Sequence, residues 1–285
     1  MTIKTVGIVG SGIMGSGVAE VAAKTGHQVV LRSRRQESAD AMLAALEKSL
    51  ARQVERGKLE ASERDATLSR VTATAKLHDL ADCDLVLESV VEDLAVKREL
   101  FRELDDVCGE DTILATNTST LAVIELAMET TRPDRVCGVH FFNPAPMMSL
   151  VEIVRPLTAS DGTIAEVRAF AEACGKSPVE VKDRAGFIVN ALLFPYLNNA
   201  VRMLENGTAS RDDIDTAMKG GCNFPMGPLA LLDLVGLDTS LAILDALYDE
   251  FRDPNYAAMP LLRRMVTAGQ LGRKSGLGFY DYARK

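Results

Sequence analysis

The chain has 285 residues, of which 47% are hydrophobic and 25% charged, and its formal net charge is −8. This composition is typical of a soluble globular protein with one large domain or two ordinary ones. The acidic balance argues against nucleic acid as the main partner, and no apolar run approaches the roughly 20 residues of a membrane span.

Cysteine usage and the amino-terminal sequence bear on the cellular compartment. Five cysteines lie far apart without a CxxC pair, at positions 83, 108, 137, 174 and 222. Their number and spacing fit neither a metal cluster nor a disulfide framework. The first residues, MTIKTVGIVG, enter a strand without the basic head and cleavage site of a secretory leader. We therefore expect a reduced, cytoplasmic setting.

The first half of the chain alternates between predicted strands and predicted helices. Short runs rich in Val, Ile and Leu are typical of parallel strands buried on both faces, and they cover 5–10, 28–32, 84–89, 112–117, 135–141, 150–155 and 178–182. Helical patterns cover 13–25, 36–70, 93–107 and 120–130. This alternation predicts an α/β fold with a Rossmann-type, doubly wound, mostly parallel sheet.

After Asp183 the pattern changes to helical spacing without a convincing strand. Gly207 is a typical helix end, and Ser210 followed by Asp213 is a typical helix start. We therefore expect a dinucleotide-binding domain over residues 1–183 and a smaller all-helical domain over residues 184–285. The helical domain carries so much apolar surface that part of it is expected to meet another subunit.

A GxGxxG motif joins the first predicted strand to the first predicted helix. Gly10 permits a tight turn, Gly12 lets a pyrophosphate approach the backbone, and Gly15 lets the helix pack on the strand, with Ile13 and Met14 between them. The helix N-terminus supplies N–H groups and a favourable dipole for the phosphates. In this context the motif predicts dinucleotide binding; the alternative is a glycine-rich turn of structural use only.

The end of the second predicted strand bears on the choice of cofactor. Ser33 stands where an acidic residue is expected to bond the adenosine ribose. Arg34 and Arg35 follow, and both can donate charge-assisted hydrogen bonds to a 2′-phosphate. This favours NADP(H) over NAD(H). The alternative is that the arginines are solvated and that Glu37 or Asp40 reaches the ribose, as NAD(H) requires.

A histidine and a glutamate suggest the chemistry. His140 ends a predicted buried strand, where open α/β sheets bind their ligands. Glu152 stands alone among apolar neighbours in a later strand, and a buried carboxylate needs a partner such as an imidazole. Beside a nicotinamide, such a pair suits alcohol–ketone interconversion, because the imidazole moves the hydroxyl proton while the carboxylate fixes its tautomer. Considered singly, each residue is more often structural.

Eight segments match one family in order. They are GxGxMG, ESVVED (88–93), NTST (117–120), HFFNPAP (140–146), LVEIV (150–154), GFIVN (186–190), PMGPLALLDLVGLD (225–238) and GRKSGLGFYDY (272–282). The chain resembles a short-form L-3-hydroxyacyl-CoA dehydrogenase and is most similar to bacterial 3-hydroxybutyryl-CoA dehydrogenases. The resemblance covers nearly the whole chain.

The resemblance implies roles for four residues of the reaction site. His140 becomes the general acid/base and Glu152 its orienting partner. Ser119 is expected to hydrogen-bond the 3-oxygen of the substrate close to the nicotinamide. Asn190 is expected to hold the substrate and polarise its carbonyl. The site is then expected to lie between the domains.

The resemblance also implies cofactor contacts and shows two departures. Glu92 and Lys97 match positions that contact the cofactor, and Asn117 lies beside it; the alternative for Glu92 and Lys97 is a surface ion pair on a helix. Family members usually carry Asp where Ser33 stands, which is why the cofactor is in question. A second serine commonly follows their NTS motif, and Thr120 takes its place here.

A basic segment is suited to bind coenzyme A, the carrier of the acyl group. Arg52 and Arg56 are four residues apart and share one face if the segment is helical. Related enzymes hold the coenzyme A phosphates with a helical hairpin inserted after the second strand, here about residues 36–70. Ser49, Arg52 and Arg56 occupy the corresponding places, with Lys58 nearby, and arginine forks suit phosphate geometry.

We therefore expect a homodimeric L-3-hydroxyacyl-CoA dehydrogenase that acts on a short acyl-CoA substrate, such as the 3-hydroxybutyryl-CoA/acetoacetyl-CoA pair. One alternative is a dehydrogenase of the same fold that acts on a sugar acid or a hydroxyacyl carrier protein. Another is a non-catalytic structural protein of the crystallin type. The presence of all four reaction-site residues argues against the structural protein.

Overall fold

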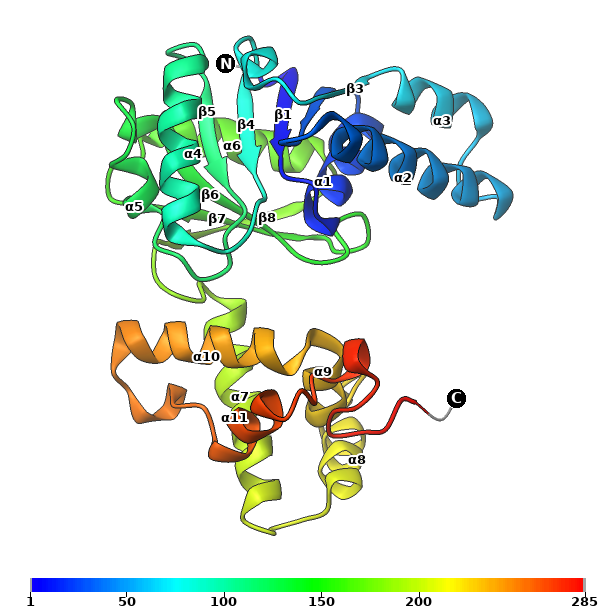
Figure 1. Cartoon of the computed structure of the whole chain (residues 1–285), viewed down its shortest axis with the longest axis vertical. Coiled ribbons are helices and arrows are strands. Elements are labelled where there is room, and N and C mark those ends of the chain that lie inside the picture. Colours follow the sequence, from blue (N-terminus) through cyan, green and yellow to red (C-terminus); the bar gives the residue numbers. More distant parts are fainter. Residues whose placement is uncertain (1, 284–285) are drawn as a thin grey trace. The chain divides into compact units, whose positions relative to one another are not determined.

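The computed structural model describes residues 2–283. It contains two compact units, Met1–Asp183 and Arg184–Lys285, which are described separately (Figure 1). The change from alternating strands to helical spacing in the sequence falls at the same place, after Asp183.

The first unit is built on one eight-stranded sheet with the strand order β3-β2-β1-β4-β5-β6-β7-β8. Its strands are β1 (Thr5–Val9), β2 (Gln28–Arg32), β3 (Val71–Thr74), β4 (Leu85–Glu88), β5 (Ile113–Thr116), β6 (Val136–Phe141), β7 (Leu150–Arg155) and β8 (Ser177–Lys182). All neighbouring strands run parallel except β6 and β7, which are antiparallel. The predicted doubly wound α/β class is confirmed.

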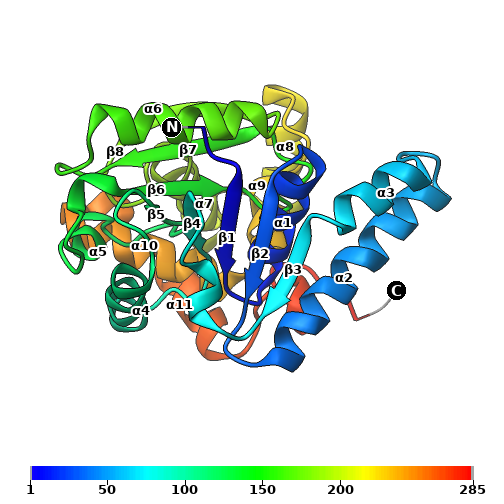
Figure 2. The ribbon, with the colours of Figure 1, turned by 90° about the horizontal axis from the view of Figure 1, so that it is seen from above.

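Helices cover both faces of this sheet. One buried core joins the sheet to α1 (Ile13–Lys24), α2 (Gln36–Glu55) and α6 (Asp161–Ala173). Figure 2 shows α4 (Leu94–Val107) across the sheet from α6, and α4 packs with α5 (Ile124–Ala127). Short 3₁₀ turns, η1 (Leu77–Leu80) and η2 (Pro133–Arg135), complete the connections. The strand order reverses between β1 and β4, which is where doubly wound sheets bind their ligands.

The helical hairpin expected after β2 is present as α2 and α3 (Ala61–Leu68), which lie side by side in Figure 2. Gly57 has φ +64° just beyond α2, and Glu60 begins α3 with a reciprocal capping box to Glu63. The sequence missed β3, because VTAT is short and half polar. The helix expected over 120–130 is wrong in length, since only the four residues of α5 are helical.

The second unit is helical. It contains α7 (Val189–Glu205), α8 (Arg211–Cys222), α9 (Pro228–Val235), α10 (Leu237–Phe251) and α11 (Pro260–Thr267), with the 3₁₀ turns η3 (Pro254–Tyr256) and η4 (Arg273–Ser275). Ser210 caps α8 by accepting from the Asp213 N–H, and Gly207 follows α7 with φ +65°, as the sequence predicted. The long helical run over 227–251 is divided at Gly236, whose φ is +102°.

Two buried aspartates anchor the last described segment of this unit. Asp233 accepts from the N–H groups of Phe279 and Tyr280 at 2.9 and 2.8 Å. Asp215 accepts from the Leu229 N–H at the start of α9 and from the Tyr280 hydroxyl. The GLGFYDY motif therefore has a structural role in holding α8 and α9 together. Within residues 2–283, no helix is both long and apolar enough to cross a membrane.

Candidate functional site

The loop between β1 and α1 has room for a pyrophosphate. Gly10 has φ +127°, and a Cβ there would lie 2.2 Å from the Ser89 carbonyl oxygen. A Cβ at Gly15 would lie 2.5 Å from the Gly10 oxygen, so helix and strand approach closely. A Cβ at Gly12, the N-cap of α1, would meet nothing within 4 Å. The loop is therefore tight on its protein side and open where phosphates would approach the α1 N-terminus.

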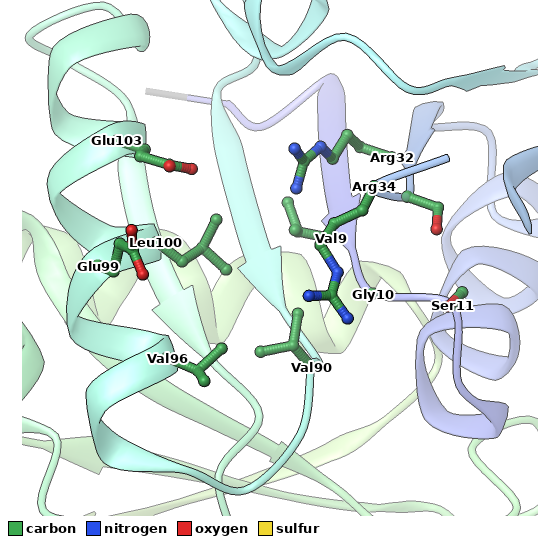
Figure 3. A pocket seen from close by; sticks show the side chains of 11 residues that line it. Val9, Gly10, Ser11, Arg32, Arg34, Val90, Val96, Glu99, Leu100 and Glu103 are labelled. Atoms are coloured by element: carbon green, nitrogen blue, oxygen red, sulfur yellow. The ribbon is translucent and has the colours of Figure 1, made fainter. Parts of the chain in front are cut away.

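A pocket of about 350 Å³ continues from this loop along the ends of β1 and β2 to α4 (Figure 3). Its lining residues are Val9, Gly10, Ser11, Arg32, Ser33, Arg34, Val90, Val96, Glu99, Leu100 and Glu103. We call this the adenosine pocket, because a dinucleotide whose pyrophosphate lies at α1 directs its adenosine toward the end of β2.

Among the predicted cofactor residues, Ser33 and Arg34 line the adenosine pocket. Ser33 is buried, with 6% of its surface exposed. Arg35 is the exposed N-cap of α2 and does not line the pocket. Asp40, the alternative ribose partner, accepts a hydrogen bond from Gln36 at 2.8 Å on the exposed face of α2.

The sequence did not identify Arg32, Glu99 and Glu103 as lining residues. Arg32 belongs to the basic stretch that flanks Ser33 at the end of the predicted second strand, but the sequence assigns it no cofactor contact. Glu99 and Glu103 are four residues apart, so they share one face of α4. The spacing of the two glutamates predicts an acidic face on this helix. It does not predict that this face lies across the pocket from the end of β2.

His140 and Glu152 are brought together by the register of β6 and β7, in which they are directly opposed. His140 Nδ1 lies 2.8 Å from Glu152 Oε2, and the glutamate is fully buried. An ionised carboxylate only accepts hydrogen bonds, so the proton on Nδ1 faces Glu152. With this assignment, Nε2 of His140 is the ring nitrogen that faces the Ser119 hydroxyl.

Ser119 completes a chain of three residues. Its Oγ lies 3.2 Å from His140 Nε2. Asn117, two residues earlier after β5, accepts from the Phe141 N–H at 2.8 Å and so joins the NTST loop to the end of β6. The Phe142 ring packs against the His140 ring at a centroid distance of 4.5 Å. The structure therefore brings Ser119, His140 and Glu152 into one hydrogen-bonded line.

Glu92 and Lys97 belong to a largely buried network behind the NTST loop. Lys97 Nζ lies 2.8 and 2.9 Å from the two oxygens of Glu88, and 3.1 Å from Glu92. The Lys97 side chain is 1% exposed, so the interpretation of Glu92 and Lys97 as a surface ion pair is wrong. Glu92 accepts from the Thr118 hydroxyl at 2.5 Å and from the Ser119 N–H at 2.8 Å.

Opposing effects act on the Glu92 carboxyl. Burial by itself raises its pKa, whereas Lys97 and the hydrogen bonds from Thr118 and Ser119 lower it. The donors prevail, and the pKa of Glu92 lies below its ordinary value. Glu92 is therefore held ionised and fixes the backbone at Ser119.

The residues expected to hold coenzyme A lie on the hairpin. Arg52 and Arg56 are exposed near the end of α2, with their side chains open to solvent. Ser49 faces α1, where its hydroxyl donates to Glu20 at 3.0 Å. Gln53 donates to the same carboxylate at 2.8 Å, so Ser49 also helps to pack α2 on α1.

Asn190, the fourth predicted reaction-site residue, lies in the first turn of α7 in the second unit and is 7% exposed. The start of α7 also borders an apolar groove of about 710 Å³. The groove is lined by Ile188, Val189, Leu192, Leu193, Tyr196, Phe224, Pro225, Met226, Leu231 and Leu234. Leu192 is 72% exposed and Leu234 is 49% exposed.

Comparison with known proteins relates both units to one family. Residues 5–184 match the family model for the 3-hydroxyacyl-CoA dehydrogenase, NAD binding domain, and residues 186–282 match that for the 3-hydroxyacyl-CoA dehydrogenase, C-terminal domain. The chain is 50% identical to a 3-hydroxybutyryl-CoA dehydrogenase of Clostridioides difficile, over 96% of this chain and 98% of that relative. It is 50% identical to one of Mycobacterium tuberculosis, over 98% and 99%. The crystal structure of (S)-3-hydroxybutyryl-CoA dehydrogenase from Ralstonia eutropha superposes with a TM-score of 0.97 at 43% identity, over 99% of both chains.

Proposed function

The chain belongs to the 3-hydroxyacyl-CoA dehydrogenase family, and from that premise we propose that it interconverts L-3-hydroxybutyryl-CoA and acetoacetyl-CoA. The observation that carries the proposal is the line of Ser119 after β5, His140 near the end of β6 and Glu152 on β7, in a unit with a dinucleotide loop. This line provides a proton donor and acceptor at an alcohol or carbonyl oxygen.

Each of the four reaction-site residues has its own role in the proposed reaction. A bound nicotinamide dinucleotide supplies hydride to C3 of the oxo substrate or accepts it from C3 of the alcohol. In reduction, His140 gives the Nε2 proton to the 3-oxygen, and Glu152 stabilises the imidazolium before this transfer. Ser119 donates a hydrogen bond to the same oxygen. Asn190 holds the thioester carbonyl.

Replacing the histidine tests the proton step. His140→Asn should lower kcat for acetoacetyl-CoA reduction by about 10²- to 10⁴-fold, as expected for loss of a general acid. Cofactor binding, followed by the fluorescence of the reduced nicotinamide, should be retained. His78→Asn is the matched control, because His78 is exposed on η1. An unchanged kcat in His140→Asn would refute the assignment.

We further propose that NADP(H) is preferred over NAD(H). Support comes from the adenosine pocket, which holds Ser33 and Arg34 and lacks a carboxylate at position 33. The test is kcat/KM for acetoacetyl-CoA reduction at matched NADPH and NADH. We expect about a tenfold advantage for NADPH, or about 1.4 kcal/mol of transition-state binding. Equal values, or an advantage for NADH, would mean that Arg34 and Arg35 are solvated surface residues that do not bind the 2′-phosphate.

The basic hairpin distinguishes coenzyme A from other acyl carriers. Replacing Arg52 and Arg56 together by Ala should raise the KM for acetoacetyl-CoA about tenfold and leave kcat nearly unchanged, because the exposed guanidinium groups bind phosphate far from the reacting carbon. Lys48→Ala is a control on the same helix. No change in KM would favour a sugar acid or a hydroxyacyl carrier protein as the substrate.

The apolar groove of the second unit supports a homodimer. A groove with Leu192 and Leu234 exposed is expected to be covered by another protein surface. Leu192→Glu should therefore shift the protein to a monomer in analytical ultracentrifugation. Leu157→Glu is the control, because Leu157 is 99% exposed in the first unit and lies outside the groove. A monomeric wild-type protein at assay concentration would remove the dimer from the proposal.

A further inference from the structure

The adenosine pocket carries opposite charges on its two walls. Arg32 and Arg34 extend from the end of β2, and Glu99 and Glu103 extend from α4 (Figure 3). The two carboxylates come from consecutive turns of one helix and are both exposed at the pocket rim. A ligand in the pocket therefore meets a basic wall and an acidic wall at the same time.

Arg32 enters this pocket without a full set of partners. The side chain is partly buried, and its Nε is buried without a hydrogen-bond partner among the described residues. Burial lowers the pKa of Arg32, Glu103 raises it, and Arg34 lowers it further. An unsatisfied buried N–H costs free energy, and an ordered water or a bound anion at this edge of the pocket would reduce that cost.

We propose that Arg32 and Glu103 are a pair of opposing specificity determinants for the adenosine 2′-substituent. Arg32 donates to the 2′-phosphate from the end of β2, opposite α4. Glu103 partly neutralises Arg32 and repels the phosphate, so it restrains the preference for NADP(H) and keeps NAD(H) usable. The inference rests on the proposed binding of the cofactor's adenosine in this pocket, and it adds the residue that limits selectivity.

The chain contains a matched control for this role. Glu99 carries the same charge on the same helix and lines the same pocket, but Figure 3 shows Glu103 opposite the Arg32 guanidinium and Glu99 one turn further along α4. Glu103→Gln should raise the ratio of kcat/KM for NADPH to that for NADH by about three- to tenfold, and Glu99→Gln should raise it less. Arg32→Met should lower the ratio by about tenfold.

A double-mutant cycle tests whether the two residues act on each other. In the Arg32→Met background, Glu103→Gln should have a much smaller effect, because only direct repulsion of the phosphate remains. An unchanged ratio in Glu103→Gln would overturn the inference. Equal effects of Glu99→Gln and Glu103→Gln would also overturn it, since both carboxylates would then act only through their negative charge and not through Arg32.

Binding of adenosine phosphates separates this inference from the proposed reaction. Titration calorimetry with adenosine 2′,5′-bisphosphate and with 5′-AMP measures the affinity of each ligand for the pocket without any turnover. If Glu103→Gln strengthens the bisphosphate relative to 5′-AMP in a protein that fails to reduce acetoacetyl-CoA, the inference stands and the proposed substrate fails. If the protein turns over while neither the binding ratio nor the kinetic ratio changes, the inference alone fails.

Discussion

Helix α4 takes part in two charged groups at the same edge of the sheet, and the two groups differ in how far their charges are paired. On its buried side, Lys97 lies between Glu88 and Glu92 with Nζ–O distances of 2.8 to 3.1 Å. On its exposed side, Glu99 and Glu103 face Arg32 and Arg34 across the adenosine pocket. The charges on the exposed side lie apart on opposite walls, and the Arg32 Nε has no partner among residues 2–283.

This difference separates a positioning role from a recognition role. The paired group satisfies its own hydrogen bonds, and through Glu92 it fixes the Ser119 backbone next to His140. The exposed charges of the adenosine pocket, which form the open group, are not paired with one another, so a ligand can bind to them. Changes in the buried group should therefore alter stability, whereas changes in the open group should alter the choice of ligand.

The largest expected effect comes from breaking the buried group. Lys97→Met leaves Glu88 buried without its counter-charge and should lower the free energy of unfolding by about 3–5 kcal/mol. Urea denaturation measures this loss. Arg34→Met is the control, since exposed substitutions usually stay within about 0.5 kcal/mol. Similar losses in both variants would remove the contrast between the groups.

The next effect reverses the choice of cofactor. Ser33→Asp combined with Arg34→Ala introduces a carboxylate that bonds the ribose and repels a 2′-phosphate, and removes a donor to that phosphate. The ratio of kcat/KM for NADPH to that for NADH should fall by about 10- to 100-fold, or about 1.4–2.7 kcal/mol. The melting temperature should change little. A constant ratio would show that the end of β2 does not read the 2′-position.

A smaller effect should appear in the free energy of unfolding at acidic pH. The pKa of Glu92 is lowered in the folded protein, so its ionised form stabilises the fold above the unfolded pKa, and this contribution is lost as pH falls. Because its side chain is 39% exposed, Glu92→Gln should cost only about 1–2 kcal/mol at pH 7. The difference from wild type should shrink below about pH 4. Glu110→Gln, at an exposed position, should show no such pH dependence.

The features that the sequence predicted depend on local patterns. His140 and Glu152 could be paired in advance because both lie in strands, where a charged residue among apolar neighbours is conspicuous. For Lys97 the sequence leaves a surface ion pair open as an alternative, because α4 is rich in charged residues and its inward face is clear only in the packed unit. Arg32 and Glu103 lie 71 positions apart, and no local pattern brings them to one pocket.

The smallest expected effect tests whether Arg35 acts together with the charged residues of the adenosine pocket. Arg35 is the N-cap of α2, makes no side-chain capping hydrogen bond and lies outside the adenosine pocket. Arg35→Ala should therefore change the NADPH/NADH ratio of kcat/KM by less than about twofold, because water and salt screen an exposed charge. A tenfold or larger loss would place the 2′-phosphate over the start of α2. The acidic wall of α4 would then face no phosphate, and Glu103 could not restrain the choice of cofactor.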